Sequence, residues 1–260
     1  MFARLARAPG LGLMLIAALA ASPAWAAPAM VELAPIDPSN AGDTAWMLTA
    51  AAFVMLFALP GIALVNACRG PAHAALSVLL QAGAIAALVS LLWVMVGYTL
   101  GFGNARGGVI GDGNAWMLIV LGNVRFGTEV PESAFVLFQI AGAMLAAVIV
   151  AGCWAGRTRF GWALAFGGLW SLIVYAPVAH WVWGGGWLGA YGVVDYAGGI
   201  ALHFSAGVSA LVAALMVGRR TGWPNAPHAA MLALAGSMLL FVGNFALVGG
   251  WTLAATDDAS

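Results

Sequence analysis

The chain has 260 residues, of which 63% are apolar and 7% are charged, and its formal net charge is zero. A soluble domain carries roughly a quarter charged residues, so this composition indicates an integral membrane protein. The nine basic residues are all arginines and form no basic patch, which excludes nucleic acid as a partner on electrostatic grounds.

The first 26 residues predict a cleaved signal peptide, and an uncleaved anchor helix is the alternative. Arg4 and Arg7 form a basic start, an apolar stretch of ten residues follows, and the tripeptide AWA at 24–26 fits a cleavage site. Such a stretch is too short for a hydrocarbon core that is ~30 Å thick. Residues 27–43 would then be an extracytoplasmic leader.

Six later segments each contain about 20 or more largely apolar residues, the length that a transmembrane helix needs. Their apolarity is continuous rather than alternating, which argues against a membrane β-barrel. We therefore predict an all-α polytopic membrane protein with one transmembrane domain over 44–251 and a short extracytoplasmic tail over 252–260. The predicted spans are 44–67, 74–100, 133–155, 160–183, 197–218 and 227–250.

The arginines between the predicted spans indicate the orientation of the chain. Five of them follow the first, third and fifth spans, whereas two lie on the other side together with all nine acidic residues. Because cytoplasmic loops are enriched in arginine, we expect the group of five in the cytoplasm and both mature termini outside the inner membrane. The five are Arg69, Arg157, Arg159, Arg219 and Arg220, and the two are Arg106 and Arg125.

The sequence shows no pattern typical of an enzyme or a metalloprotein. The four histidines are scattered and have no metal-ligand spacing, and no nucleophile–base pair is present. The glycine-rich stretch GGVIGDG at 107–113 follows no predicted strand and opens no nucleotide-binding fold. We therefore predict no catalytic residue, no metal and no cofactor.

His203 points most directly to function. It lies within the fifth predicted span, where an ionisable side chain is costly and uncommon. Gly199 and Gly207 are four residues before and after it, so the three residues share one helix face. A smooth face with one imidazole suits a pore wall, and a structural hydrogen bond to a neighbouring helix is the alternative explanation.

Two residues before this span are further candidates. Asp195 can accept hydrogen bonds from free backbone N–H groups near Ala197 and Gly198, a capping role at the positive end of the helix. Gly198 and Gly199 would be structural neighbours of the site. Trp183, beside three glycines, can belong to an aromatic belt or offer its ring face to a cation at a pore mouth.

Several segments are similar to the ammonium transporter/Rhesus (Amt/Mep/Rh) family. The most specific are YAPVAHWVWGGGWL at 175–188 and VVDYAGGIALHFSAGVSALVAALMVGRR at 193–220, and the resemblance covers roughly residues 40–250. It implies a bundle of about eleven helices, built from two inverted halves and assembled as a trimer with one pore per subunit. The six spans would correspond to the first half plus one helix.

The resemblance also implies roles for individual residues. Trp183 would form the aromatic wall of an outer cation site, and Phe138 would match the outer of two phenylalanines in the third span. Asp195 would be the acidic residue that opens the fifth span. His203 would be the first of two pore histidines, one from each half.

Three positions depart from the family pattern. The inner phenylalanine of the third span falls on Gly142, and the phenylalanine of the sixth span falls on Leu247. A serine that would help to bind the cation falls on Trp251. We therefore expect an altered outer site and an altered gate.

The favoured prediction is a channel that moves ammonium or ammonia across the lipid bilayer of the inner membrane. The chain ends after six spans, so the second half with the partner histidine would be missing. Either a second polypeptide supplies that half, several copies assemble, for example as a homotrimer, or the chain is a truncated relative. The alternative functions are a non-conducting paralogue that associates with full-length transporters, and a channel for another small neutral solute.

Overall fold

Helices make up most of the chain in the computed structural model, which describes residues 40–219 and 227–256. The expected signal peptide, residues 27–39 of the expected leader, Arg220 and residues 257–260 of the expected tail lie outside these residues. The main helices are α2 (Ala41–Phe53), α3 (Leu59–Ala67), α4 (Ala72–Leu92), α5 (Tyr98–Phe102), α6 (Glu132–Ala151), α7 (Phe160–Trp170), α8 (Ala176–Trp183), α9 (Trp187–Ala190), α10 (Ser205–Val217) and α11 (Pro227–Gly250). Shorter 3-10 segments are η5 (Gly113–Leu118) and η6 (Gly152–Trp154).

Six continuous helical stretches among the described residues are long and apolar enough to cross a membrane. This confirms the expected helical membrane fold with six spans. The stretches cover 41–67, 72–102, 132–154, 160–190, 199–217 and 229–250.

Short π-helical segments lie within three of these stretches, and a fourth opens the stretch 199–217: they are η3 (Val54–Ala58), η4 (Trp93–Gly97), η7 (Ser171–Tyr175) and η8 (Gly199–Phe204). Pro60 and Pro177 stand at the start of the helices that follow η3 and η7. Proline has no N–H and clashes with the carbonyl four residues back, so the preceding turn widens. The segment η8 contains His203, so a π turn rather than a regular α turn presents this side chain.

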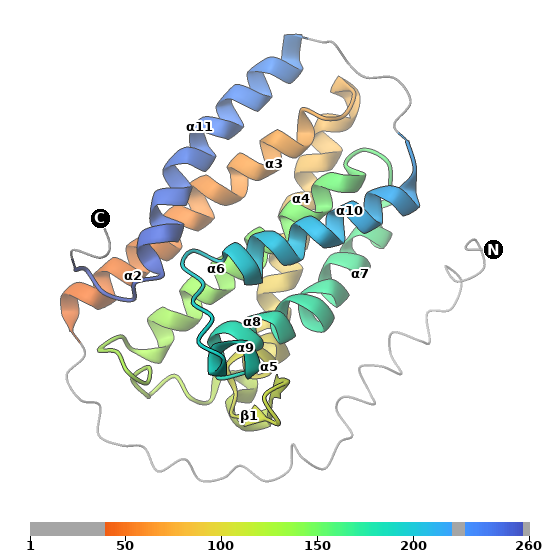
Figure 1. The fold of residues 1–260 in the computed structure, drawn as a ribbon. Helices are drawn as coiled ribbons and strands as arrows, with labels where there is room; N and C mark the ends of the chain where they lie inside the picture. Colours follow the sequence, from red (N-terminus) through yellow and green to blue (C-terminus); the bar gives the residue numbers. More distant parts are fainter. Residues whose placement is uncertain (1–39, 220–226, 257–260) are drawn as a thin grey trace. The chain divides into compact units, whose positions relative to one another are not determined.

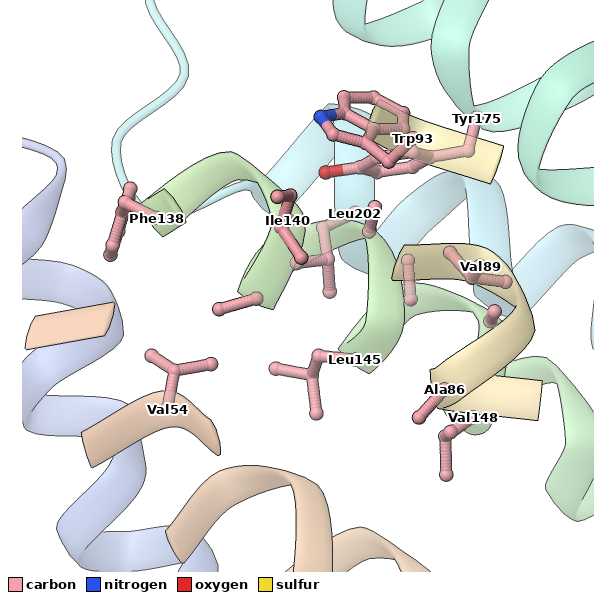
Figure 2. Close-up of a cluster of buried hydrophobic side chains, with 14 of the residues drawn as sticks. Val54, Ala86, Val89, Trp93, Phe138, Ile140, Leu145, Val148, Tyr175 and Leu202 are labelled. Carbon is pink, nitrogen blue, oxygen red and sulfur yellow. The ribbon is translucent and has the colours of Figure 1, made fainter. Parts of the chain in front are cut away.

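The helix α6 is the centre of the bundle. Of its membrane-crossing part 78% is buried, against 22% for the stretches that contain α10 and α11. It packs against α2, α3, α4, α7 and α10, whereas α11 lies along α2 and α3 (Figure 1). Figure 2 shows part of the apolar core that α6 shares with η3 and α4. The helices α10 and α11 therefore keep wide uncovered faces.

The connection between α5 and α6 contains a small hairpin. Strands β1 (Ala105–Arg106) and β2 (Ile110–Gly111) pair antiparallel, with Ala105 opposite Gly111. Gly107 and Gly108 in the turn have φ values of +64° and +72°, which glycine adopts without strain. The expected all-α fold is thus correct except for this hairpin, whose turn and second strand come from the glycine-rich stretch at 107–113.

One end of the bundle carries this hairpin, and we call it the loop end. There α2 and α6 begin, and α5, α8 and α11 end. The indole N–H of Trp46 on α2 donates to the backbone oxygen of Gly249 on α11 at 2.9 Å. The backbone N–H of Ala255 donates to the Asp43 carboxylate at 2.8 Å, so the segment after α11 is fixed to the start of α2.

Candidate functional site

Asp195 and Trp183 form a connected unit at the loop end. The indole N–H of Trp183, the last residue of α8, donates to the backbone oxygen of Asp195 at 3.1 Å. The Asp195 carboxylate accepts hydrogen bonds from the backbone N–H groups of Ile200 and Ala201, each at 2.9 Å. It therefore satisfies two of the free N–H groups in the first turn of η8.

The donors to Asp195 differ from the expected ones, which were near Ala197 and Gly198. Those two residues have φ values of +70° and +75°, so the backbone turns through the left-handed region before the helix begins. Helical geometry starts only at Gly199. The first free N–H groups that face the carboxylate are consequently those of Ile200 and Ala201.

Gly198, just before η8, and Gly199, its first residue, lie directly against this unit. A Cβ atom at Gly198 would lie 2.8 Å from Cβ of Leu202 and 3.5 Å from Cη2 of Trp183. Only a residue without a side chain fits there, and its positive φ adds the same requirement. A Cβ atom at Gly199 would lie 3.4 Å from Oδ1 of Asp195. Both glycines thus allow η8 to begin close to Trp183 and Asp195.

A stack of aromatic rings connects Trp183 to Phe138 through Trp251. The indoles of Trp183 and Trp251 stack with ring centroids 3.8 Å apart and an angle of 25° between their planes. The buried Phe138 ring meets Trp251 edge-on, at 5.3 Å and 76°. The structure therefore brings two candidate residues together, and Trp251, at the expected serine position, joins them.

A cavity of about 390 Å³ adjoins this stack. Both stacked indoles line it, and Asp195 and Arg125 contribute its charged groups. The Arg125 guanidinium lies 3.4 Å from the Glu132 carboxylate and 4.4 Å from the centre of the Phe135 ring. Sequence reasoning had assigned no site role to Arg125 or Glu132, although charged residues are only 7% of this chain and could have drawn attention to both.

His203 lies apart from the aromatic stack. Its side chain is exposed, whereas those of Ala201 and Leu202 are fully buried against the bundle. Gly199 and Gly207 are exposed as well, in keeping with one shared helix face. The imidazole forms no hydrogen bond with the described residues, so within this part of the chain it does not fasten η8 to a neighbouring helix.

The expected gate positions are filled by other side chains. A Cβ atom at Gly142 would lie 3.3 Å from the Tyr175 hydroxyl and 3.9 Å from Cδ1 of Leu202. Tyr175 and Leu202, both labelled in the apolar core of Figure 2, therefore stand where a phenylalanine at 142 would need space. Leu247 is 1% exposed and belongs to the same core.

No metal site is evident within the described ranges: no group of three or more histidine, cysteine, aspartate or glutamate side chains is arranged to hold a metal ion. The candidate site therefore offers three kinds of group. They are an aromatic stack beside a cavity, a capping carboxylate, and one exposed imidazole on a glycine-lined face.

Known proteins with similar sequences are ammonium transporters. The Bacillus subtilis ammonium transporter is 40% identical over 210 residues, which cover 78% of this chain and 51% of that protein. The Aquifex aeolicus ammonium transporter is 35% identical over 222 residues, which cover 85% of this chain and 52% of that protein. The chain thus spans about half the length of the relatives it matches.

Solved structures with the same fold include the Mep2 proteins of yeasts. Saccharomyces cerevisiae Mep2 superposes with a TM-score of 0.77 at 32% identity, over 84% of this chain and 52% of that one. Candida albicans Mep2 gives a TM-score of 0.76 at 29% identity, over 87% and 51%. The sequence model of the Ammonium Transporter Family matches residues 45–260, and the chain therefore belongs to this family of membrane transporters.

Proposed function

We propose that the chain forms part of a channel that moves ammonium or ammonia across the inner membrane. The observation that carries this proposal is the placement of two features at and after the start of one helical stretch, 199–217. The Trp183–Asp195 unit stands at the start of η8, and the exposed His203 follows on the glycine-lined face. Membership of the ammonium transporter family supplies the substrate class.

The loop end faces the outside in this proposal. The arginine distribution supports that orientation, because Arg157 and Arg219 lie on loops at the opposite end of their spans. Residues 1–26 act as a signal peptide, and both mature termini remain outside. Ammonium is attracted to the outer mouth by the indole face of Trp183.

The chemistry follows from the cost of moving an ion through an apolar passage. A bare ammonium ion loses far more hydration free energy on entering such a passage than neutral ammonia does. Ammonium therefore sheds its proton near the mouth, and ammonia moves along the face of Gly199 and Gly207. The imidazole of His203 is the group on this face that can accept and release a proton.

The exposed His203 face needs a covering surface before it can line a pore. An uncovered face would meet lipid, where an ionisable side chain is costly. We propose that a second surface, from a homotrimer or from a complementary polypeptide, covers it.

A channel for another small neutral solute is the second candidate function. The stack of Trp251 on Trp183 favours it, because an indole occupies the ring face on which a cation would bind. A non-conducting relative that associates with full-length transporters is the third, and it predicts no flux of either kind of solute.

Proteoliposomes with an ammonium gradient test the favoured function. We expect ammonium-dependent current and methylammonium uptake, and a large loss of both in His203→Ala. The control is His73→Ala, which removes an exposed imidazole at the start of α4. Equal flux in the two variants and the unaltered chain would remove His203 from the mechanism.

A further inference from the structure

Trp251 occupies the place at which a cation would meet Trp183. We propose that this side chain is a built-in plug of the outer site: its indole stands in for the cation and must leave before a cation can bind. This inference rests on the proposed function for the identity of the cation. The occlusion of Trp183 itself rests on geometry alone.

The short distance between the two indole rings excludes a cation from the face of Trp183. A cation binds an aromatic face within about 6 Å of the ring centroid. The centroid of the Trp251 ring lies 3.8 Å from that of Trp183, and the planes are within 25° of parallel. This is contact distance for two stacked rings, so no ion fits between them.

The indole of Trp251 is incompletely hydrogen-bonded in its stacked position. The indole nitrogen of Trp251 is buried and forms no hydrogen bond with the described residues. A buried indole N–H normally finds an acceptor, and leaving it without one is unfavourable. Stacking on Trp183 and the edge contact with Phe138 offset this cost. Ring contacts and packing against the core therefore hold the stacked position, and a competing ligand has no hydrogen bond of the indole to the described residues to displace.

The adjoining cavity offers space for the Trp251 side chain. Trp251 lines the cavity of about 390 Å³ together with Trp183, so the ring borders space into which it can turn. Its backbone stays in place meanwhile, because its N–H bonds the oxygen of Val248 and Trp46 bonds the neighbouring Gly249. A side-chain rotation, without movement of α11, is enough to open the face of Trp183.

Hydroxyl-radical footprinting with mass spectrometry tests the occlusion residue by residue. In Trp251→Ser we expect oxidation of Trp183 to rise about two- to tenfold, the range that corresponds to the loss of one aromatic pair. Trp251→Phe keeps a ring in the stack and should restore most of the protection. Trp162 on α7, which is 45% exposed and is left unchanged in every variant, serves as the internal reference.

Trp187→Ser is the matched control variant. It removes another indole at the loop end, one that contacts Trp181 and Tyr191. Oxidation of Trp183 should not change in it. Oxidation of Trp183 that is the same in the unaltered chain and in Trp251→Ser would overturn the plug. So would a rise in Trp251→Phe as large as that in Trp251→Ser, since a loss of local packing would then explain both.

Measuring Trp183 oxidation at increasing methylammonium concentrations tests the plug independently of the proposed function. We expect methylammonium to protect Trp183 in Trp251→Ser at concentrations about two- to tenfold lower than in the unaltered chain. Oxidation that rises in Trp251→Ser but responds to methylammonium in neither protein would support occlusion and contradict the cation site. Equal half-protecting concentrations in both proteins would overturn the plug even if flux is observed.

Discussion

The Asp195 carboxylate caps the first turn of η8 by accepting hydrogen bonds from two backbone N–H groups. The capping role follows from a carboxylate placed just before an apolar span, and the structure has it in that role. The donors do not follow from the sequence, because Ala197 is a non-glycine residue with positive φ. Such residues are uncommon, so sequence reasoning starts the helix too early.

The cap predicts a difference between two substitutions of Asp195. Asp195→Ala leaves the N–H groups of Ile200 and Ala201 without their acceptor, and we expect a loss of about 0.5–2 kcal/mol in the free energy of unfolding. Asp195→Asn keeps an acceptor oxygen of the same reach, so its stability should stay close to that of the unaltered chain.

Thermal unfolding of the two Asp195 variants in detergent provides the measurement. Trp183→Phe is a useful companion, because it removes the hydrogen bond to the backbone oxygen of Asp195 and leaves the carboxylate in place. Equal destabilisation in Asp195→Ala and Asp195→Asn would mean that charge, and not capping, holds this turn.

At the scale of elements, the spans are the most predictable part and the connections are the least. Continuous apolar stretches bounded by arginine, glycine and proline are enough to locate six helices. No pattern in the sequence indicates the π turn at η8 or the packing of Tyr175 into the space beside Gly142. Both depend on contacts between helices that are distant in sequence.

The connection before α6 is held by charged and aromatic groups at the loop end. Glu132, which is 6% exposed, accepts a hydrogen bond from the Tyr98 hydroxyl and pairs with Arg125. The Arg125 guanidinium in turn covers the Phe135 ring. This network fixes the start of α6 to the end of the α4–α5 stretch, and its Arg125 and Phe135 side chains line the cavity beside the aromatic stack.

Glu132→Gln tests how much this network contributes. It removes the charge that balances Arg125, and losing one partner of a buried pair costs roughly 3–5 kcal/mol. We expect less, about 2 kcal/mol, because Arg125 remains 20% exposed to solvent. Tyr98→Phe removes one hydrogen bond to this carboxylate and should cost about 1.5–3 kcal/mol. Unfolding temperatures of both variants equal to that of the unaltered chain would contradict this view of the network.

At the scale of the whole molecule, the family membership and the half-length match follow from sequence, whereas the uncovered surface needs the structure. His203 could be assigned to a helix face from its spacing to two glycines. That this face is open along η8 and α10 is known only from the packing of the other helices around α6. The second surface that the proposed pore requires has to meet this open face.

Gly207→Leu distinguishes an open face from a covered one. A Cβ atom at Gly207 would meet nothing within 4 Å, so the substitution leaves the packing of this chain intact. If another surface covers the face or solute moves along it, a leucine side chain obstructs both. We expect normal folding, measured by unfolding temperature in detergent, and a large loss of flux or of assembly in membranes.

Gly83→Leu is the matched control for Gly207→Leu, since a Cβ atom there also meets nothing within 4 Å and the residue lies on the exposed side of α4. Both substitutions replace a helical glycine and add the same apolar surface, so they share every effect of helix propensity and lipid contact. Flux and crosslinked assembly should fall only in Gly207→Leu. An equal response in both variants would mean that the His203 face has no special role, and that its imidazole faces lipid in the working protein.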